Sequence, residues 1–193
     1  MPGYATTLRN SRLDAITTRA GNAALLRFYD GTRPATGGTA TTLLAELTCG
    51  TPFAAGASSG VLTAGTITQD SSANASGTAT WARLVQSDGT THVADFSVGV
   101  QASTTVSGTS GAATVTVGSN SGIAISDVAA GTGIATGARV VNINGTTVTL
   151  DTNNTGTVSG TGTFSKEINL VTTTIVATQP VSISSLTITE PNA

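Results

Sequence analysis

The chain has 193 residues, and the small residues Thr, Ala, Gly and Ser make up more than half of it. Charged residues account for 9%, aromatic residues for 4%, and the formal net charge is −2. No global positive field is therefore present to attract nucleic acid or anionic lipid. With 38% hydrophobic residues the chain is too apolar to stay disordered. Its few large rings predict modest burial per residue, which assembly with partners would supplement.

The sole cysteine is Cys49, so an intramolecular disulfide and the paired cysteines of zinc or redox sites are excluded. We expect it to be a small buried side chain. The first twenty residues contain no apolar core typical of a secretion signal. No segment approaches the roughly 18 apolar residues of a membrane span. The sequence therefore predicts neither export nor a membrane partner.

Residues 6–20 have the periodicity of a helix, and Gly21-Asn22 follows as a stop signal. On a helical wheel three arginines share the apolar side, which consists of Leu8, Leu13, Ala15, Ile16, Ala20, Arg9, Arg12 and Arg19. One interpretation is that this side meets another chain, whose carboxylates or carbonyls pair with the guanidinium groups. The other is that the arginine stems lie over the protein's own sheet with their charges in water.

The N-terminal part is locally basic, because five of the seven arginines fall within the first 33 residues. In a chain of net charge −2, this patch suits an acidic protein surface better than DNA, since phosphate recognition usually brings more lysines over a wider stripe. The residues predicted to contact a partner are Leu8, Arg9, Arg12, Ile16, Arg19, Arg27 and Arg33.

Beyond the helix, short apolar runs bounded by turn signals predict strands. These runs cover residues 24–29, 43–47, 61–68, 113–117, 140–143 and 146–150, and two longer strands are expected at 168–177 and 180–190. The dipeptide Asn144-Gly145 predicts a hairpin between two of these runs.

A second hairpin is predicted where segments 78–87 and 90–98 flank Asp88-Gly89, a pair suited to a two-residue type I′ turn. In the register that this turn sets, Trp81 faces Phe96, and such a ring pair adds about 0.5–1 kcal/mol beyond burial. The residues predicted to pack in the core are Trp81, Phe96, Leu84 and Val93.

The composition changes between residues 101 and 164, where charge is nearly absent and Phe164 is the first aromatic residue. β-Branched residues return from 165 onward, and we expect them to add strands to a sheet begun earlier. The sequence thus predicts a mainly β fold with one N-terminal helix. Residues 1–100 and 165–193 would form a discontinuous antiparallel β-sandwich or barrel-like domain, and 101–164 an inserted small Gly/Thr-rich β module.

Residues suited to catalysis or metal binding are sparse, with one His, one Cys and one Lys in the chain. His92 and Asp95 would face opposite sides of a regular strand and cannot pair without a bulge. Neither a nucleophile elbow nor a phosphate loop occurs. Asp151, Asn153 and Gly156 resemble the start of a calcium loop but lack its later ligands, which favours a simple polar turn. We predict no enzyme activity, no catalytic residue, no metal and no cofactor.

Several phrases resemble small virion proteins of tailed bacteriophages: TTLRNSRLDAIT, LLRFYDGTRPATGGTATTLLAEL, TATWARLVQSDGTT and QPVSISSLTITEPNA. The phrase GSNSGIAISDVAAGTGIATGARVVNINGTTVTL is similar to Gly/Thr-rich β modules of phage tail and fibre proteins. The shortest such virion proteins join the two flanking parts directly, so the module is an addition to that pattern.

This resemblance implies a structural virion protein, and our preferred version is a capsid decoration or cement protein on the outside of the head. Its partners would be the major capsid protein and further copies of the chain, in a trimer or dimer, with the module as a projecting knob. It would be made in the host cytoplasm and located on the capsid surface. The alternative is a tail, neck or fibre component whose module contacts the host surface. The lack of acid/base groups disfavours a cell-wall hydrolase.

Overall fold

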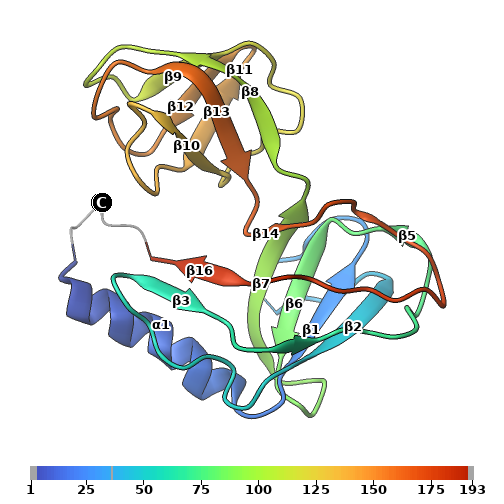
Figure 1. The fold of residues 1–193 in the computed structure, drawn as a ribbon. Coiled ribbons are helices and arrows are strands. Elements are labelled where there is room, and N and C mark those ends of the chain that lie inside the picture. The colour runs from blue at the N-terminus through green and yellow to red at the C-terminus, as the bar shows by residue number, and fades with distance from the viewer. Residues whose placement is uncertain (1–3, 36, 191–193) are drawn as a thin grey trace. The chain divides into compact units, whose positions relative to one another are not determined.

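The computed structural model describes residues 4–35 and 37–190, and it confirms a mainly β fold with one helix among these residues (Figure 1). Residues 1–3 and 191–193, which the prediction includes in the main domain, lie outside the described residues. The helix is α1 (Thr6–Ala20), and the strands are β1 (Leu25–Tyr29), β2 (Leu43–Cys49), β3 (Val61–Thr63), β4 (Ile67–Thr68), β5 (Gly77–Thr78), β6 (Trp81–Val85), β7 (His92–Gly99), β8 (Ala102–Ser107), β9 (Thr114–Val117), β10 (Val128–Thr132), β11 (Val140–Asn144), β12 (Thr147–Leu150), β13 (Ser159–Ser165), β14 (Ile168–Asn169), β15 (Thr174–Ile175) and β16 (Thr187–Thr189).

Two compact units divide the described chain. Residues 4–99 and 170–190 belong to one, which we call the main unit, and residues 100–169 form the other, the insertion unit. The second boundary therefore lies five residues beyond the predicted one. The two ends of the main unit's interruption meet, because the Leu170 N–H donates a hydrogen bond of 2.9 Å to the Gly99 carbonyl.

The main unit is built on an antiparallel sheet in which β7, β6, β1, β2 and β4 follow in this order. The register places Leu26 opposite both Leu47 and Leu84, and all three side chains are fully buried. Small two-stranded ribbons, β3 with β16 and β5 with β15, complete this unit. The sheet's other face carries charged side chains at Arg27 and Arg83, which stand opposite each other on β1 and β6.

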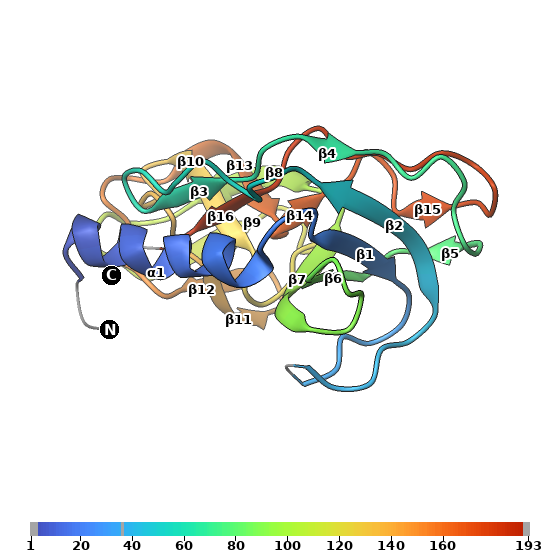
Figure 2. The ribbon, with the colours of Figure 1, turned by 90° about the horizontal axis from the view of Figure 1, so that it is seen from below.

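α1 has the predicted bounds and buries Leu13 and Ala20. It ends at Gly21, whose φ of +70° is a left-handed conformation that glycine adopts without strain. In Figures 1 and 2 the helix runs beside the ribbon of β3 and β16. Leu8 is 48% exposed, so the apolar side of the predicted wheel is not buried as a whole.

Polar side chains fasten α1 to the loop that precedes β3. The Asn10 Oδ1 atom accepts a hydrogen bond of 2.8 Å from the Gly60 N–H. The Asp14 Oδ1 atom accepts one of 2.7 Å from the Ala57 N–H. Because both bonds satisfy backbone donors of a loop that has no ladder partner at these positions, they stabilise the loop and the helix together.

The hairpin of β6 and β7 is confirmed, and Val85 pairs with His92 as in the predicted register, but the predicted turn type and the pairs farther from the turn are wrong. Gly89 has a positive φ and Asp88 does not, so the turn is not type I′, and the Gly89 N–H bonds to the Gln86 carbonyl. A bulge at Val93 shifts the pairing by one residue on the side away from the turn, which places Trp81 opposite Ser97 rather than Phe96. Trp81 instead stacks on Tyr29, with 4.4 Å between the ring centroids.

The four predicted core residues of this hairpin differ in their burial. Trp81 and Leu84 are fully buried and Phe96 is 4% exposed, whereas Val93 is half-buried. The register skips Val93, because Leu84 pairs with Ala94 and the next residue pairs with His92. Val93 is therefore a bulge residue. Because it is an extra residue in β7, His92 and Ala94 do not share one side of the sheet as they would in a regular strand.

The long C-terminal strands predicted at 168–177 and 180–190 are wrong. The structure has three short strands there, β14, β15 and β16, each of two or three residues. The predicted strand at 61–68 is also interrupted, because Ala64 and Gly65 bond to Leu186 and Phe53 between β3 and β4. A Thr-rich, β-branched composition favours extended backbone, but strand length depends on where a partner edge is present.

The insertion unit is a six-stranded antiparallel sheet of order β10-β13-β8-β9-β12-β11. It curls, since Val128 in β10 also bridges to Arg139, just before β11. The predicted hairpin of β11 and β12 is confirmed, but Asn144 pairs with Thr147, so its loop is Gly145-Thr146. Strands β8, β10 and β13 were not predicted, because their Gly, Ala and Thr residues show little apolar alternation.

Candidate functional site

The seven residues predicted to contact a partner fall on three elements. Leu8, Arg9, Arg12, Ile16 and Arg19 lie on α1, Arg27 lies on β1, and Arg33 lies in the connection from β1 to β2. Within the residues that the structure covers, most of the arginines among them have partners in their own chain. The five arginines therefore do not form one free anchoring surface, because their guanidinium groups have different partners.

Arg9 and Arg12 tie the helix to the C-terminal segment of the main unit. The Arg9 Nη1 atom donates a hydrogen bond of 3.0 Å to the Glu190 carbonyl, and the Arg12 Nη1 atom lies 2.5 Å from the Glu190 carboxylate. Gly60 makes room for this contact, because a Cβ atom there would lie 2.2 Å from Arg9 Nη1. These two guanidinium groups thus pair with a carbonyl and a carboxylate, as one interpretation expected, but within the same chain.

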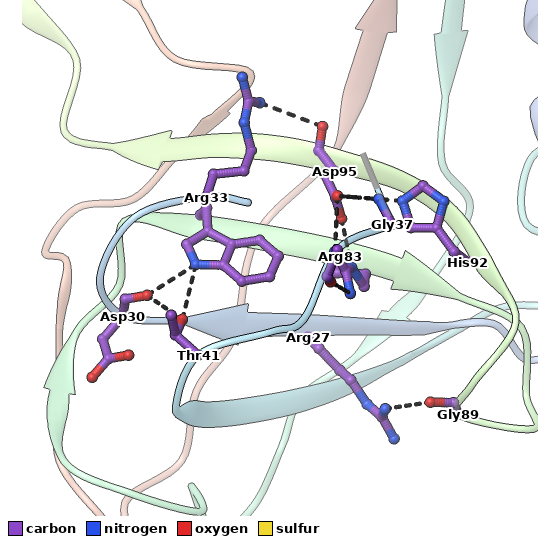
Figure 3. Close-up of polar contacts among 11 residues, drawn as sticks. Arg27, Asp30, Arg33, Gly37, Thr41, Arg83, Gly89, His92 and Asp95 are labelled. Carbon is purple, nitrogen blue, oxygen red and sulfur yellow. Dashed lines mark hydrogen bonds and ion pairs between the residues drawn. The ribbon is translucent and has the colours of Figure 1, made fainter. Parts of the chain in front are cut away.

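Arg27 and Arg33 also have partners in the main unit (Figure 3). Arg27 Nε lies 2.6 Å from the Glu46 carboxylate, and its Nη1 donates to the Gly89 carbonyl at 2.5 Å. Arg33 Nη1 donates a long hydrogen bond, 3.5 Å, to the Asp95 carbonyl. Arg27 therefore joins β1 to β2 and to the turn between β6 and β7.

Arg19 differs from the other four N-terminal arginines. Its side chain is exposed, and within the described parts of the chain its guanidinium group makes no hydrogen bond or ion pair. Its carbonyl accepts a hydrogen bond of 2.7 Å from Gln86 Nε2, which holds the end of the helix to the turn between β6 and β7. The Arg19 side chain is thus free to bind a group outside this chain.

The exposed side of α1 forms a continuous surface that we call the outer arc. Its residues are Thr7, Leu8, Ser11, Arg12, Ala15, Thr18 and Arg19. At 100° per residue these seven positions span 140° of the helix, whereas Ile16 is half-buried at the margin. The outer arc contains two arginines and no acidic residue, so its charge has one sign.

A shallow groove of about 640 Å³ lies along the outer arc. It is lined by Ser11, Asp14, Ala15, Thr18, Arg19 and Gln86. The hydroxyls of Ser11 and Thr18 donate back to helix carbonyls, as side chains on α-helices often do, so they do not require an external partner. Sequence reasoning missed Gln86, because only the fold brings the turn between β6 and β7 to the end of α1.

A buried polar cluster lies on the charged face of the main sheet (Figure 3). Arg83 binds Asp95 through two bonds, Nε to Oδ1 at 2.7 Å and Nη2 to Oδ2 at 3.0 Å, and donates to the Gly38 carbonyl at 2.9 Å. Burial opposes ionisation of Asp95, but the hydrogen bonds and charge of Arg83 outweigh it and lower the pKa of Asp95. The hydrogen bond to Asp95 raises the pKa of Arg83.

His92 joins this cluster, contrary to the expectation that it and Asp95 face opposite sides. The bulge at Val93 turns His92 to the side of Asp95, and the Nε2 atom lies 3.3 Å from Asp95 Oδ2. Asp95 also accepts a hydrogen bond of 3.4 Å from the Gly37 N–H. The carboxylate thus holds the connection between β1 and β2 over the sheet, and its oxygens are already engaged by protein donors.

The sheet register explains the cluster. Glu46, Arg27, Arg83 and Asp95 stand opposite one another in sequence across β2, β1, β6 and β7. Like charges directly opposite are unfavourable, but each arginine turns to its own acid and a loop carbonyl. A charged residue inside the apolar run of β6 is the signal that could have indicated a buried ion pair.

The polar turn that resembles a calcium loop has a structural role. Asp151 Oδ1 accepts the Arg139 N–H at 2.8 Å, and buried Asn154 donates to the Thr109 and Thr114 carbonyls. Among the residues covered by the structure, no three His, Cys, Asp or Glu side chains form a group that could hold a metal ion. Burial raises the pKa of the Cys49 thiol to about 11.

Comparison with protein-family models, curated proteins and solved structures finds no match for this chain. Among the residues that the structure describes, no helix has the length and the apolar character needed to cross a membrane.

Proposed function

We propose that this chain is a non-enzymatic structural protein of a tailed-bacteriophage particle, and specifically a capsid decoration or cement protein. In this role it binds the outer surface of the major capsid protein lattice and stabilises the head. The bacteriophage assignment rests on the sequence phrases quoted above, since no relative or family speaks for or against it.

The observation that supports a binding role rather than a catalytic one is that most charged groups described above in the main unit contact each other or backbone carbonyls. Arg83, Asp95 and His92 face one another beneath a loop, and Arg9 and Arg12 hold the chain's C-terminal segment. The outer arc of α1 remains, with an exposed Leu8 and with an Arg19 guanidinium group that has no partner among the residues that the structure describes. Such a surface suits contact with another protein.

A repeating shell makes weak contacts sufficient. Many copies on one lattice combine individually modest affinities when each copy, or each oligomer of copies, touches several shell subunits. A dimer or trimer of this chain would match the two-fold and three-fold positions of such a lattice. The insertion unit would then be the projecting knob. Its chain leaves the main unit after Gly99 and returns at Leu170, and these two residues are hydrogen-bonded to each other.

The second candidate is a tail, neck or fibre component whose module contacts the host surface. Rows of facing Thr and Ser side chains on the insertion unit favour it. Thr161 stands opposite Thr105, and Ser107 opposite Thr116, which in turn stands opposite Thr147. These side chains are exposed. A neutral surface of aligned hydroxyls suits a polar or sugar-bearing partner, although no aromatic ring accompanies them to stack on a sugar.

Copy number distinguishes the two candidates. Quantitative mass spectrometry of purified particles should find copies on the order of hundreds, as the repeated positions of an icosahedral shell require. About a dozen copies or fewer would favour the tail, neck or fibre role. Absence from particles, together with turnover of a substrate by the purified protein, would contradict both. An electron-microscopy map of the particle would locate the protein directly.

A further inference from the structure

We infer that the groove along α1 binds an amphipathic helix of a partner protein, with acidic residues beside its apolar ridge. This inference rests on the proposed function only for the identity of that partner, the shell protein. The groove itself is a property of the main unit and can be tested on the isolated chain.

The spacing of the outer arc suits helix-on-helix packing. Leu8 and Ala15 are seven residues apart, and Ser11 and Thr18 repeat the same interval beside them, so they form a seam with heptad spacing. Three of these four side chains are small, which lets a second helix approach closely. The groove of about 640 Å³ along this seam is large enough for several side chains of a partner's apolar ridge.

The charges beside the seam select the partner. Arg12 and Arg19 are also seven residues apart and flank the seam on one side. The Arg19 guanidinium group has no partner among the described residues, and Arg12 keeps 49% of its side chain exposed beside Glu190. Asp14, the acid in the groove lining, is engaged by the Ala57 N–H. A carboxylate on the incoming helix would therefore complete an ion pair with Arg19.

A second copy of α1 fits this groove poorly. If two copies of the helix packed antiparallel along the seam, Arg12 of one copy would face Arg19 of the other. Two arginines would then oppose each other twice in the same contact, and only Arg12, through Glu190, has a compensating carboxylate among the described residues. Like-charge contacts of this kind suppress a wrong partner, so the charge pattern favours a different, acidic helix.

The test uses two synthetic amphipathic helical peptides that share one leucine ridge and carry either glutamates or lysines beside it. Each peptide is titrated into the full-length ¹⁵N-labelled chain. We expect the glutamate peptide to shift the amide signals of Leu8, Ala15, Arg19 and Gln86, and the lysine peptide to bind at least about tenfold more weakly. Equal binding of both peptides, or shifts confined to other residues, would overturn the inference.

Two variants sharpen the test. Arg19→Glu should weaken the glutamate peptide about tenfold and improve the lysine peptide. Ala15→Gln should weaken both peptides by filling the groove while keeping a good helix former. Arg139→Glu, the same charge change in the insertion unit, is the matched control and should change neither affinity. Unaltered affinities for Arg19→Glu would contradict the proposed ion pair.

The outcomes separate this inference from the proposed function. If the chain occupies purified particles and Arg19→Glu leaves its occupancy unchanged, the groove inference fails while the decoration role stands. If the chain is absent from particles and the glutamate peptide still binds the outer arc, the groove stands and its partner is another protein.

Discussion

The main unit and the insertion unit are both antiparallel β structures, but they fill their interiors differently. The main unit buries Trp81, Phe28 and Phe53 completely. The insertion unit buries one ring, Phe164, and otherwise packs small aliphatic side chains. Glycine makes room for these side chains, because a Cβ atom at Gly162 would lie 2.6 Å from a Val106 methyl. A Gly/Thr-rich sequence can therefore form a core when aliphatic side chains fill the space that its glycines leave.

The two units also differ in how they use charge. The main unit aligns two ion pairs across a sheet, of which Arg83 with Asp95 is the more buried. The insertion unit has one buried pair among its described residues, Lys166 with Asp127, at 2.5 Å. Lys166 also donates to the Gly122 carbonyl at 2.9 Å. In both units the cation of the pair also donates to a loop carbonyl, and so holds that loop in place.

The largest expected effect tests this role in the main unit. Arg83→Met should lower the free energy of unfolding by about 3–5 kcal/mol, because it leaves Asp95 buried without its partner. Urea unfolding followed by the fluorescence of Trp81, the only tryptophan, measures it. The double variant Arg83→Met with Asp95→Leu is the control and should recover part of the loss. A loss below about 1 kcal/mol, the range of surface ion pairs, would contradict a structural role.

A comparable change in the insertion unit tests whether the units unfold separately. Phe164→Ala should lower the stability of the insertion unit by about 3–5 kcal/mol, because it removes the only buried ring there. Amide hydrogen exchange should then rise in residues 100–169, while the Trp81 transition stays in place. A matching shift of the Trp81 transition would show that the two units unfold as one.

Acid should weaken the main unit through Asp95 and Asp88. The pKa of Asp95 is lowered below its usual 3.8, and hydrogen bonds from Thr91 and Thr90 lower that of Asp88 to about 2. Carboxylates with a lowered pKa in the folded state stabilise it above the unfolded pKa, and this contribution is lost as the pH falls through the folded pKa. The free energy of unfolding should therefore decline below about pH 4.

Substitutions of the two acids check the acid effect. Asp95→Asn should flatten the decline most, because its pair with Arg83 is buried, and Asp88→Asn should flatten it less at its exposed turn. Urea unfolding of each variant at a series of pH values measures both effects. An unchanged pH dependence in Asp95→Asn would assign the acid sensitivity to other groups.

Excision of the insertion unit should have the smallest effect. Joining Gly99 to Leu170 by a short Gly/Ser linker should keep the main unit folded, because these residues are already hydrogen-bonded at 2.9 Å. The free energy of unfolding reported by Trp81 should change by about 1 kcal/mol or less. A protein that is unfolded by circular dichroism would show that the insertion is required for the fold.

Local sequence patterns were sufficient to predict the elements that depend only on neighbouring residues. The helix at 6–20 follows from residues within that segment, and both hairpins follow from turn dipeptides between short strands. Their registers could be predicted only in part, because the loop Gly145-Thr146 and the bulge at Val93 change which residues stand opposite each other. The short strands near the C terminus depend on distant edges, which no local pattern encodes.

The candidate site divides in the same way. The sequence by itself determined a mainly β chain with one basic amphipathic helix and sparse catalytic residue types, because composition and periodicity are properties of the chain alone. Only the tertiary structure decided which arginines are engaged. Glu190 and Glu46 are distant from Arg9 and Arg27 in sequence, and folding brings them into contact. The Arg19 guanidinium group, by contrast, has no partner in the part of the chain that the structure describes. A charge's availability depends on which distant groups the fold places within a few ångströms of it.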